Sequence, residues 1–210
     1  MSNKGHNRIA CLLILLFGFL LFYIGTDGFR AYTAETARVN QLKGTQPEFP
    51  YALLEDSNER TYSISEFEGK YVLITFMYTS CNTVCLQLEF NMGQVYDLIP
   101  SQYIGEDIVF LSISFDPERD DPATLNTYKE YFNSDGETWR MATVPDPSEL
   151  QILIEAFGVI VIPDGNGNFV HNSAFYLVDR EGKLVDVMDY QEVETAATTI
   201  ISVLESEEGE

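Results

Sequence analysis

The segment that limits the fold most narrowly is Tyr71–Tyr78, whose sequence YVLITFMY is almost wholly apolar and rich in β-branched and aromatic residues. This composition, without alternating polar positions, is typical of a central strand covered on both faces. Ile108–Ser114, IVFLSIS, has the same character. Between them, apolar residues recur at helical spacing and predict a helix that begins just past Cys81: Val84, Leu88, Met92, Val95 and Ile99. Two buried strands joined by a helix indicate an α/β fold.

The rest of the chain continues this alternation of strands and helices. The other predicted elements are a hairpin of Tyr51–Leu54 with Arg60–Ile64, helices that open at Asp121-Pro122 and at Asp146-Pro147, the second ending at Gly158, a hairpin of Ala174–Val178 with Leu184–Met188, and a helix from Glu192 to Leu204. This order predicts a three-layer α/β sandwich over residues 47–205, followed by an acidic tail at 206–210.

The N-terminus carries an apolar segment, Ile9–Ile24, which has no charged residue and follows Lys4, His6 and Arg8. Extended by residues 25–29, it nears the length that a bilayer requires. Basic residues before it and an acidic domain after it predict a cytoplasmic N-terminus. Residues 1–29 are therefore expected to be a cytoplasmic stub and the single transmembrane helix of a cell-membrane protein whose domain lies outside.

A cleaved signal peptide is the alternative interpretation of this segment. The apolar run is at the upper limit of length for one, and no small-x-small cleavage site follows it. Cys11 lies at the beginning of the run rather than after it, which argues against lipoprotein acylation. The polar residues 30–46 show no sustained period and are expected to be a linker between membrane and domain.

The charge balance is strongly acidic, with 33 acidic and 12 basic residues and a net charge of −21. Nucleic acid is excluded as a partner, because phosphate binding requires a basic surface. A solvated acidic face is the preferred explanation, and a docking surface for a basic partner is the alternative.

Two cysteines, Cys81 and Cys85, stand where the first buried strand gives way to its helix. Four-residue spacing places both side chains on one helical face. Unpaired N–H groups and the helix dipole stabilise a thiolate at the first turn. The pair is predicted to be a reactive dithiol or a metal site; a structural disulfide or two core thiols are the simpler alternative.

His171 is one of two histidines, and His6 is expected on the other side of the membrane. It follows the loop Pro163–Asn168 and precedes the strand at Ala174, in a region that this kind of fold brings beside the first helix. Two sulfurs and an imidazole suit copper or zinc rather than calcium or magnesium. Structural zinc prefers a fourth protein ligand, whereas copper(I) accepts three. A loop histidine without a ligand role is the alternative.

Two acidic segments could contribute to a site. Phe115–Asp120, FDPERD, follows the second buried strand at the same edge as the cysteines. Its carboxylates either hydrogen-bond to the ligands of a metal or open the next helix. Asp164, Asn166 and Asn168 resemble half of a calcium loop, but no glutamate follows at the required place, so they are expected to form a turn.

Three motifs together resemble the Sco/SenC family: Gly69–Cys81 continued to Cys85, Ser112–Asp120, and His171 five residues before Tyr176. The resemblance covers roughly residues 47–205 and includes the N-terminal anchor. It implies a thioredoxin-like fold and one copper ion bound by Cys81, Cys85 and His171, with Asp116 at an acidic position near the metal.

The resemblance also implies a role in assembling the dinuclear copper centre of cytochrome c oxidase. The partner would be the copper-bearing subunit of that oxidase, and the chain would deliver copper, reduce the thiols of its target, or do both. The sequence departs from the family pattern at Asn82 and Leu86, where proline usually follows each cysteine, and at Thr83, which replaces a common acidic residue. The missing prolines are expected to loosen the loop and shift thiol reactivity.

Two other functions use the same cysteines. An extracytoplasmic thiol–disulfide oxidoreductase would need the thiols and not His171, and it is the main alternative. A peroxidase would need an arginine close to its reactive cysteine in addition to a threonine such as Thr79, and the neighbouring sequence provides none.

Overall fold

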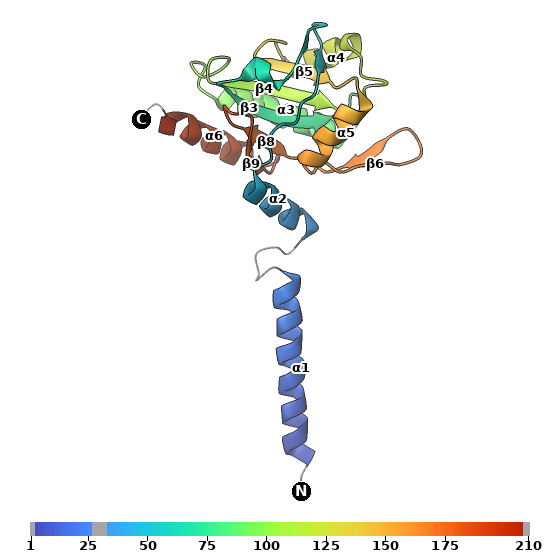
Figure 1. The fold of residues 1–210 in the computed structure, drawn as a ribbon, viewed down its shortest axis with the longest axis vertical. Coiled ribbons are helices and arrows are strands. Elements are labelled where there is room, and N and C mark those ends of the chain that lie inside the picture. Colours follow the sequence, from blue (N-terminus) through green and yellow to red (C-terminus); the bar gives the residue numbers. More distant parts are fainter. Residues whose placement is uncertain (1–2, 27–32, 208–210) are drawn as a thin grey trace. The chain divides into compact units, whose positions relative to one another are not determined.

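The central sheet has seven strands in the order β2-β1-β5-β4-β3-β8-β9 (Figure 1). The computed structural model describes residues 3–26 and 33–207. The strands of this sheet are β1 (Leu54–Asp56), β2 (Thr61–Tyr62), β3 (Tyr71–Met77), β4 (Ile108–Ser114), β5 (Trp139–Thr143), β8 (Phe175–Val178) and β9 (Leu184–Met188). Both predicted central strands and both predicted hairpins are confirmed, with bounds that differ by a few residues.

Strands β3, β4 and β5 are parallel, and β8 and β1 run antiparallel on either side of them. Every residue of β3 and β4 is buried, which explains their continuous apolar sequence. The register pairs Tyr71 with Ile108 and Met77 with Ser114. Because the two strands end at the same level, the segments that follow them, Thr79–Cys81 and Phe115–Asp120, meet at one edge of the sheet.

Helices cover both faces of the sheet, as the three-layer prediction requires. They are α3 (Val84–Leu98), α4 (Pro122–Lys129) with the short 3-10 helix η2 (Glu130–Phe132), α5 (Pro147–Ala156) and α6 (Val193–Glu207); another 3-10 turn, η1 (Ile64–Phe67), precedes β3. On β3, Thr75 faces α3, where its hydroxyl bonds to Glu89. The next residue, Phe76, points to the opposite face and packs against Phe157 at the end of α5. Helix α6 packs beside α3.

Strand β5 was not predicted. Its sequence, WRMAT, is interrupted by an arginine and an alanine, so it lacks the β-branched run that marks β3 and β4. The arginine is compatible with the sheet because Arg140 lies over the rings of Tyr62 and Phe67, 4.8 and 4.9 Å from their centroids.

A second, two-stranded sheet was not predicted, and only Pro163–Asn168, which includes the turn between its strands, was expected as a loop. It consists of β6 (Val161–Pro163) and β7 (Phe169–His171). The turn between them is held by Asp164, whose Oδ1 accepts hydrogen bonds from the backbone N–H groups of Asn166 and Asn168 at 2.7 and 3.0 Å. These contacts confirm the turn role of the three polar residues.

Two helices lie within the described residues 3–26 and 33–45, before the sheet. Helix α1 (Asn3–Gly25) includes an 18-residue stretch, Arg8–Gly25, that is long and apolar enough to cross a membrane. Helix α2 (Ala34–Thr45) occupies most of the segment expected to be a linker, of which residues 30–32 lie outside the described residues. The compact unit that carries the sheet begins at Thr45. At the other end α6 continues to Glu207, into the expected tail, and 208–210 lie outside the described residues.

Candidate metal centre

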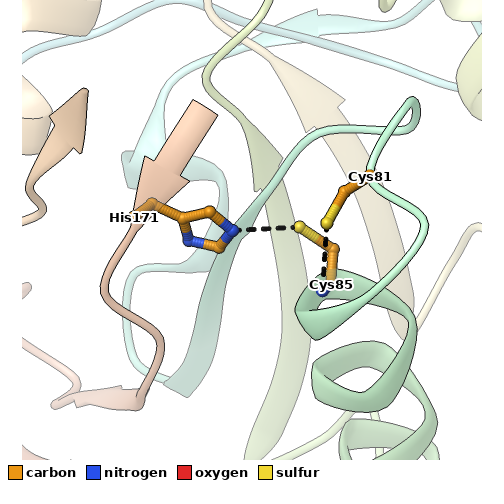
Figure 2. A group of neighbouring side chains, drawn as sticks. All are labelled: Cys81, Cys85 and His171. Atoms are coloured by element: carbon orange, nitrogen blue, oxygen red, sulfur yellow. Dashed lines mark hydrogen bonds between the residues drawn. The ribbon is translucent and has the colours of Figure 1, made fainter. Parts of the chain in front are cut away.

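Three segments that are distant in the sequence bring Cys81, Cys85 and His171 together (Figure 2). Cys81 lies in the turn between β3 and α3, and Cys85 is the second residue of α3. His171 is the last residue of β7, and its ring points toward the start of α3. The sequence therefore identified the three residues that meet, although it assigned no strand to His171, which it left between the loop Pro163–Asn168 and the strand at Ala174.

The potential ligand atoms of the three residues all lie within 4.8 Å of one another. Cys85 Sγ is 3.1 Å from His171 Nε2, and the backbone N–H of Cys85 donates to Cys81 Sγ at 3.4 Å. Both cysteines are free thiols, 4% and 0% exposed. The centre is thus compact and shielded from water at its sulfur atoms.

The surroundings push the pKa values of the two thiols in opposite directions. Burial raises the pKa of Cys81, but hydrogen bonds from the Cys85 side chain and from the backbone N–H groups of Thr83 and Cys85 outweigh it, so the pKa lies below the ordinary thiol value. Burial raises the pKa of Cys85 far above that value, and the neighbouring Cys81 raises it further. Cys81 therefore ionises first, and Cys85 keeps its proton to much higher pH.

The environment of His171 determines which ring nitrogen faces the sulfurs. Nδ1 is 3.0 Å from the carbonyl oxygen of Asn172, which can only accept a hydrogen bond, so Nδ1 carries the proton. Burial lowers the pKa of His171, although the bond to Asn172 opposes this effect. The neutral ring therefore directs the lone pair of Nε2 toward Cys85, the arrangement that a metal ligand needs.

Aromatic side chains enclose the imidazole. The ring of Phe115 lies 5.1 Å and that of Tyr78 6.1 Å from the His171 ring, centroid to centroid. Phe169 packs edge-on against both, at 5.7 and 5.2 Å. Such apolar walls exclude water and confine the ring to one orientation.

The acidic loop after β4 contributes two buried carboxylates with different partners. Asp116 accepts a hydrogen bond from the Arg119 guanidinium, and this ion pair partly offsets the burial that raises the pKa of Asp116. Asp120 accepts from the Thr79 N–H at 2.9 Å and from the Ser114 hydroxyl at 2.5 Å. Asp120 thus ties the ends of β3 and β4 together directly before the cysteine turn.

Sequence reasoning missed two residues beside the centre. Arg119 was passed over because its contacts, with Gly167 and the Phe169 ring, lie about fifty positions away. Glu89 is completely buried one helical turn after Cys85. Helical spacing could have revealed Glu89, since it falls on the apolar stripe between Cys85 and Met92.

Comparison with known proteins identifies the family of this chain. A family model described as SCO1/SenC matches residues 40–205. The SCO1 protein homolog of Bacillus subtilis is 29% identical over 155 residues, which is 72% of this chain and 78% of that relative. Copper-bound ScoI of Bradyrhizobium japonicum superposes with a TM-score of 0.62 at 27% identity, covering 74% of this chain and 98% of that one.

A third similar structure is BsSco, described as a member of the Sco family of cytochrome c oxidase assembly proteins. It superposes with a TM-score of 0.63 at 23% identity, covering 75% of this chain and 93% of that one. The fold is therefore thioredoxin-like, as the sequence resemblance implied. With the family model spanning most of the chain, this protein belongs to the SCO1/SenC family.

Proposed function

We propose that this chain is a membrane-anchored copper-binding protein that assists assembly of the dinuclear copper centre of cytochrome c oxidase. The observation that carries the proposal is the convergence of Cys81, Cys85 and His171 within 4.8 Å. Copper-bound ScoI, a relative with the same fold, supports the choice of metal. The description of BsSco supports the role in oxidase assembly.

The donor set fits copper on chemical grounds. Two sulfurs and one imidazole nitrogen are soft to borderline ligands, which copper binds strongly. Because the pKa of Cys81 is lowered, its thiolate would give the copper ion a first anionic ligand. Binding of the ion would then displace the proton of Cys85. A closed structural zinc site would use four protein ligands, whereas this cluster contains three.

The asymmetry of the thiols supports thiol–disulfide exchange as a second candidate function. The Cys81 thiolate would attack one sulfur of a target disulfide, forming a mixed disulfide and releasing the other target sulfur as thiolate. Cys85 would then pass its proton to the thiolate that the target has already released and attack Cys81 Sγ, a step that needs neither His171 nor copper. The second target sulfur leaves as a thiolate and takes up a proton from solvent. The target leaves as a dithiol, and the Cys81–Cys85 pair becomes the disulfide.

Anchoring by α1 belongs to the same proposal. The large apolar side chains from Ile9 to Ile24 are about half or more exposed in the structure, which is far more apolar surface than water tolerates on one helix. A lipid bilayer would cover it and hold the domain near a membrane-embedded oxidase.

Copper titration of the reduced domain, residues 33–210, tests the copper function. We expect about one copper per chain, a copper(II)–thiolate charge-transfer band, and loss of binding in Cys81→Ser. His171→Ala should weaken binding by at least the roughly 10–100-fold that loss of a residue supporting a ligand costs, and it should abolish that band. Because this part of the chain contains two cysteines and one histidine, the spectrum has no other source of sulfur–imidazole ligation.

The same variants separate the two candidates in cells. Copper delivery requires that His171→Ala fail to restore oxidase activity to a strain that lacks the protein. Full restoration by His171→Ala, with none by Cys81→Ser, would reject copper delivery in favour of thiol exchange.

A further inference from the structure

The hairpin that carries His171 is held differently from the elements that carry the cysteines. Cys81 and Cys85 lie between a buried strand of the seven-stranded sheet and the helix that packs on it. His171 ends a separate sheet of two three-residue strands, in which Ile162 and Val170 are 56% and 64% exposed. A hairpin this short has little stability of its own. The position of His171 therefore depends on side-chain contacts that fasten the hairpin to the domain.

Arg119 makes several of these contacts at once. Its Nε donates to the Asp116 carboxylate, and its Nη1 donates to the carbonyl oxygen of Gly167 at 2.6 Å. The guanidinium carbon lies 5.8 Å from the ring centroid of Tyr78 and 5.5 Å from that of Phe169. One side chain thus joins the ends of β3 and β4 to both the turn and the second strand of the hairpin.

The remaining contacts that hold the hairpin carry no charge. The rings of Phe115 and Tyr78 pack against those of Phe169 and His171, and further contacts are hydrogen bonds of Tyr78 and Asn172. The Tyr78 hydroxyl accepts from the Phe169 N–H at 3.3 Å and lies 3.5 Å from the Phe169 carbonyl oxygen. Asn172 bonds to the backbone of Ile160 and Gly158 beside the first strand. Arg119 supplies the charge-assisted contact, since its guanidinium is anchored by the buried carboxylate of Asp116.

We propose that Arg119 is a positioning residue that fastens the β6–β7 hairpin and so holds His171 beside Cys85. Asp116 takes part by fixing the guanidinium rather than by touching the metal. The consequence for copper rests on the proposed function, whereas the fastening of the hairpin does not. Loss of Arg119 should therefore displace the imidazole of His171 from Cys85, while the positions of Cys81 and Cys85 stay unchanged.

The test compares Arg119→Ala and Arg119→Lys with the protein that retains Arg119. All three are prepared as the full chain in detergent, and all carry Cys11→Ala. Lysine keeps a charge opposite Asp116 but cannot span Asp116 and Gly167 with one planar fork. Arg140→Gln is the matched control, because Arg140 also lies over two aromatic rings, those of Tyr62 and Phe67, but on a different part of the sheet.

Two measurements on the copper-free reduced protein address the fastening itself. Hydrogen exchange of the amides at 161–171 should accelerate about tenfold or more in Arg119→Ala, less in Arg119→Lys, and not in Arg140→Gln. The rate at which Cys81 is alkylated should not change in any of them. Unchanged exchange in the hairpin of folded Arg119→Ala and Arg119→Lys would overturn the proposal.

A copper measurement then tests the consequence. Competition with a copper(I) chelator should show Arg119→Ala weakened by about 10–100-fold, approaching His171→Ala. Wild-type affinity in Arg119→Ala despite a loosened hairpin would overturn the positioning role. If the wild type itself binds no copper, the proposed function fails, and hairpin exchange still decides whether Arg119 fastens the hairpin.

Discussion

At the scale of single residues, burial changes the protonation of one acidic side chain near the site, that of Glu89. Glu89 is 0% exposed, and its carboxylate accepts from the Thr75 hydroxyl at 2.7 Å and from the Ser112 hydroxyl at 2.5 Å. Burial raises the pKa of Glu89 to about 7, although these two hydrogen bonds oppose the change. An acid buried in the core one turn after Cys85 is costly when ionised, so its protonation state bears on stability.

Glu89→Gln should therefore change how stability depends on pH. In the folded domain Glu89 holds its proton up to a pKa of about 7, against 4.5 when exposed. The folded state then binds more protons than the unfolded state between these values, so the contribution of Glu89 is full below pH 4.5 and declines as pH rises through 7. The pKa difference corresponds to about 3 kcal/mol. Glutamine cannot ionise, so the variant should gain this amount relative to wild type between pH 4.5 and 8, measured by urea unfolding.

Glu106→Gln, at an exposed position, is the control for the general effect of removing one negative charge from an acidic protein. Glu106→Gln should change the free energy of unfolding by a similar small amount at pH 4.5 and at pH 8. A gain in Glu89→Gln that is the same at pH 4.5 and pH 8 would show that Glu89 ionises normally, and the buried-acid interpretation would be wrong.

At the scale of elements, the sequence predicted what local composition determines. Strands β3 and β4 follow from their β-branched and aromatic runs, and α3 from its apolar spacing. The starts of α4 and α5 follow from Asp-Pro pairs, where Asp121 and Asp146 cap the helices by accepting from backbone N–H groups. The cysteine half of the site was predictable for the same reason, because both thiols lie on one strand-to-helix unit.

The elements that were missed depend on contacts between distant parts of the chain. Strand β5 is stabilised by pairing with β4 and β1, and its Arg140 by rings contributed from Tyr62 and Phe67. The β6–β7 hairpin depends on Arg119 and Tyr78, which the local sequence around His171 cannot reveal. The meeting of His171 with the cysteines was expected only through the fold type and the family resemblance.

Asp120 offers a test of how two elements are joined at the site. Its buried carboxylate accepts from both the N–H and the hydroxyl of Thr79 and from the Ser114 hydroxyl. Asn at this position has one acceptor oxygen and no charge, so at least one buried donor loses its partner. Asp120→Asn should lower the free energy of unfolding by about 2–3 kcal/mol.

The neighbouring Asp121→Asn is a matched control. Asp121 caps α4 from an exposed position, and asparagine caps a helix as well as aspartate does, so the change should be near zero. Urea unfolding of both variants at neutral pH gives the comparison. Equal stability of the two would mean that Asp120 does not join the ends of β3 and β4.

At the scale of the whole molecule, two features bear on membrane topology: a net charge of −21 and an apolar N-terminal helix. The 18 residues of Arg8–Gly25 span about 27 Å as a helix, close to the roughly 30 Å hydrocarbon core of a bilayer. Lys4 precedes this span and Arg8 is its first residue, while the domain after it is acidic. Basic residues are retained on the cytoplasmic side, so this distribution favours a cytoplasmic N-terminus and an external domain.

The full chain should accordingly remain in the membrane pellet after an alkaline wash, whereas residues 33–210 alone should be soluble. Protease added to the outside of spheroplasts should digest the domain and leave a short N-terminal fragment that a tag before Met1 detects. A cleaved signal peptide would instead release a chain whose first residue lies after the apolar segment, which N-terminal sequencing would show. Protection of the domain until the membrane is lysed would contradict this topology, and it would place the cysteine pair in the cytoplasm, where disulfides are rare.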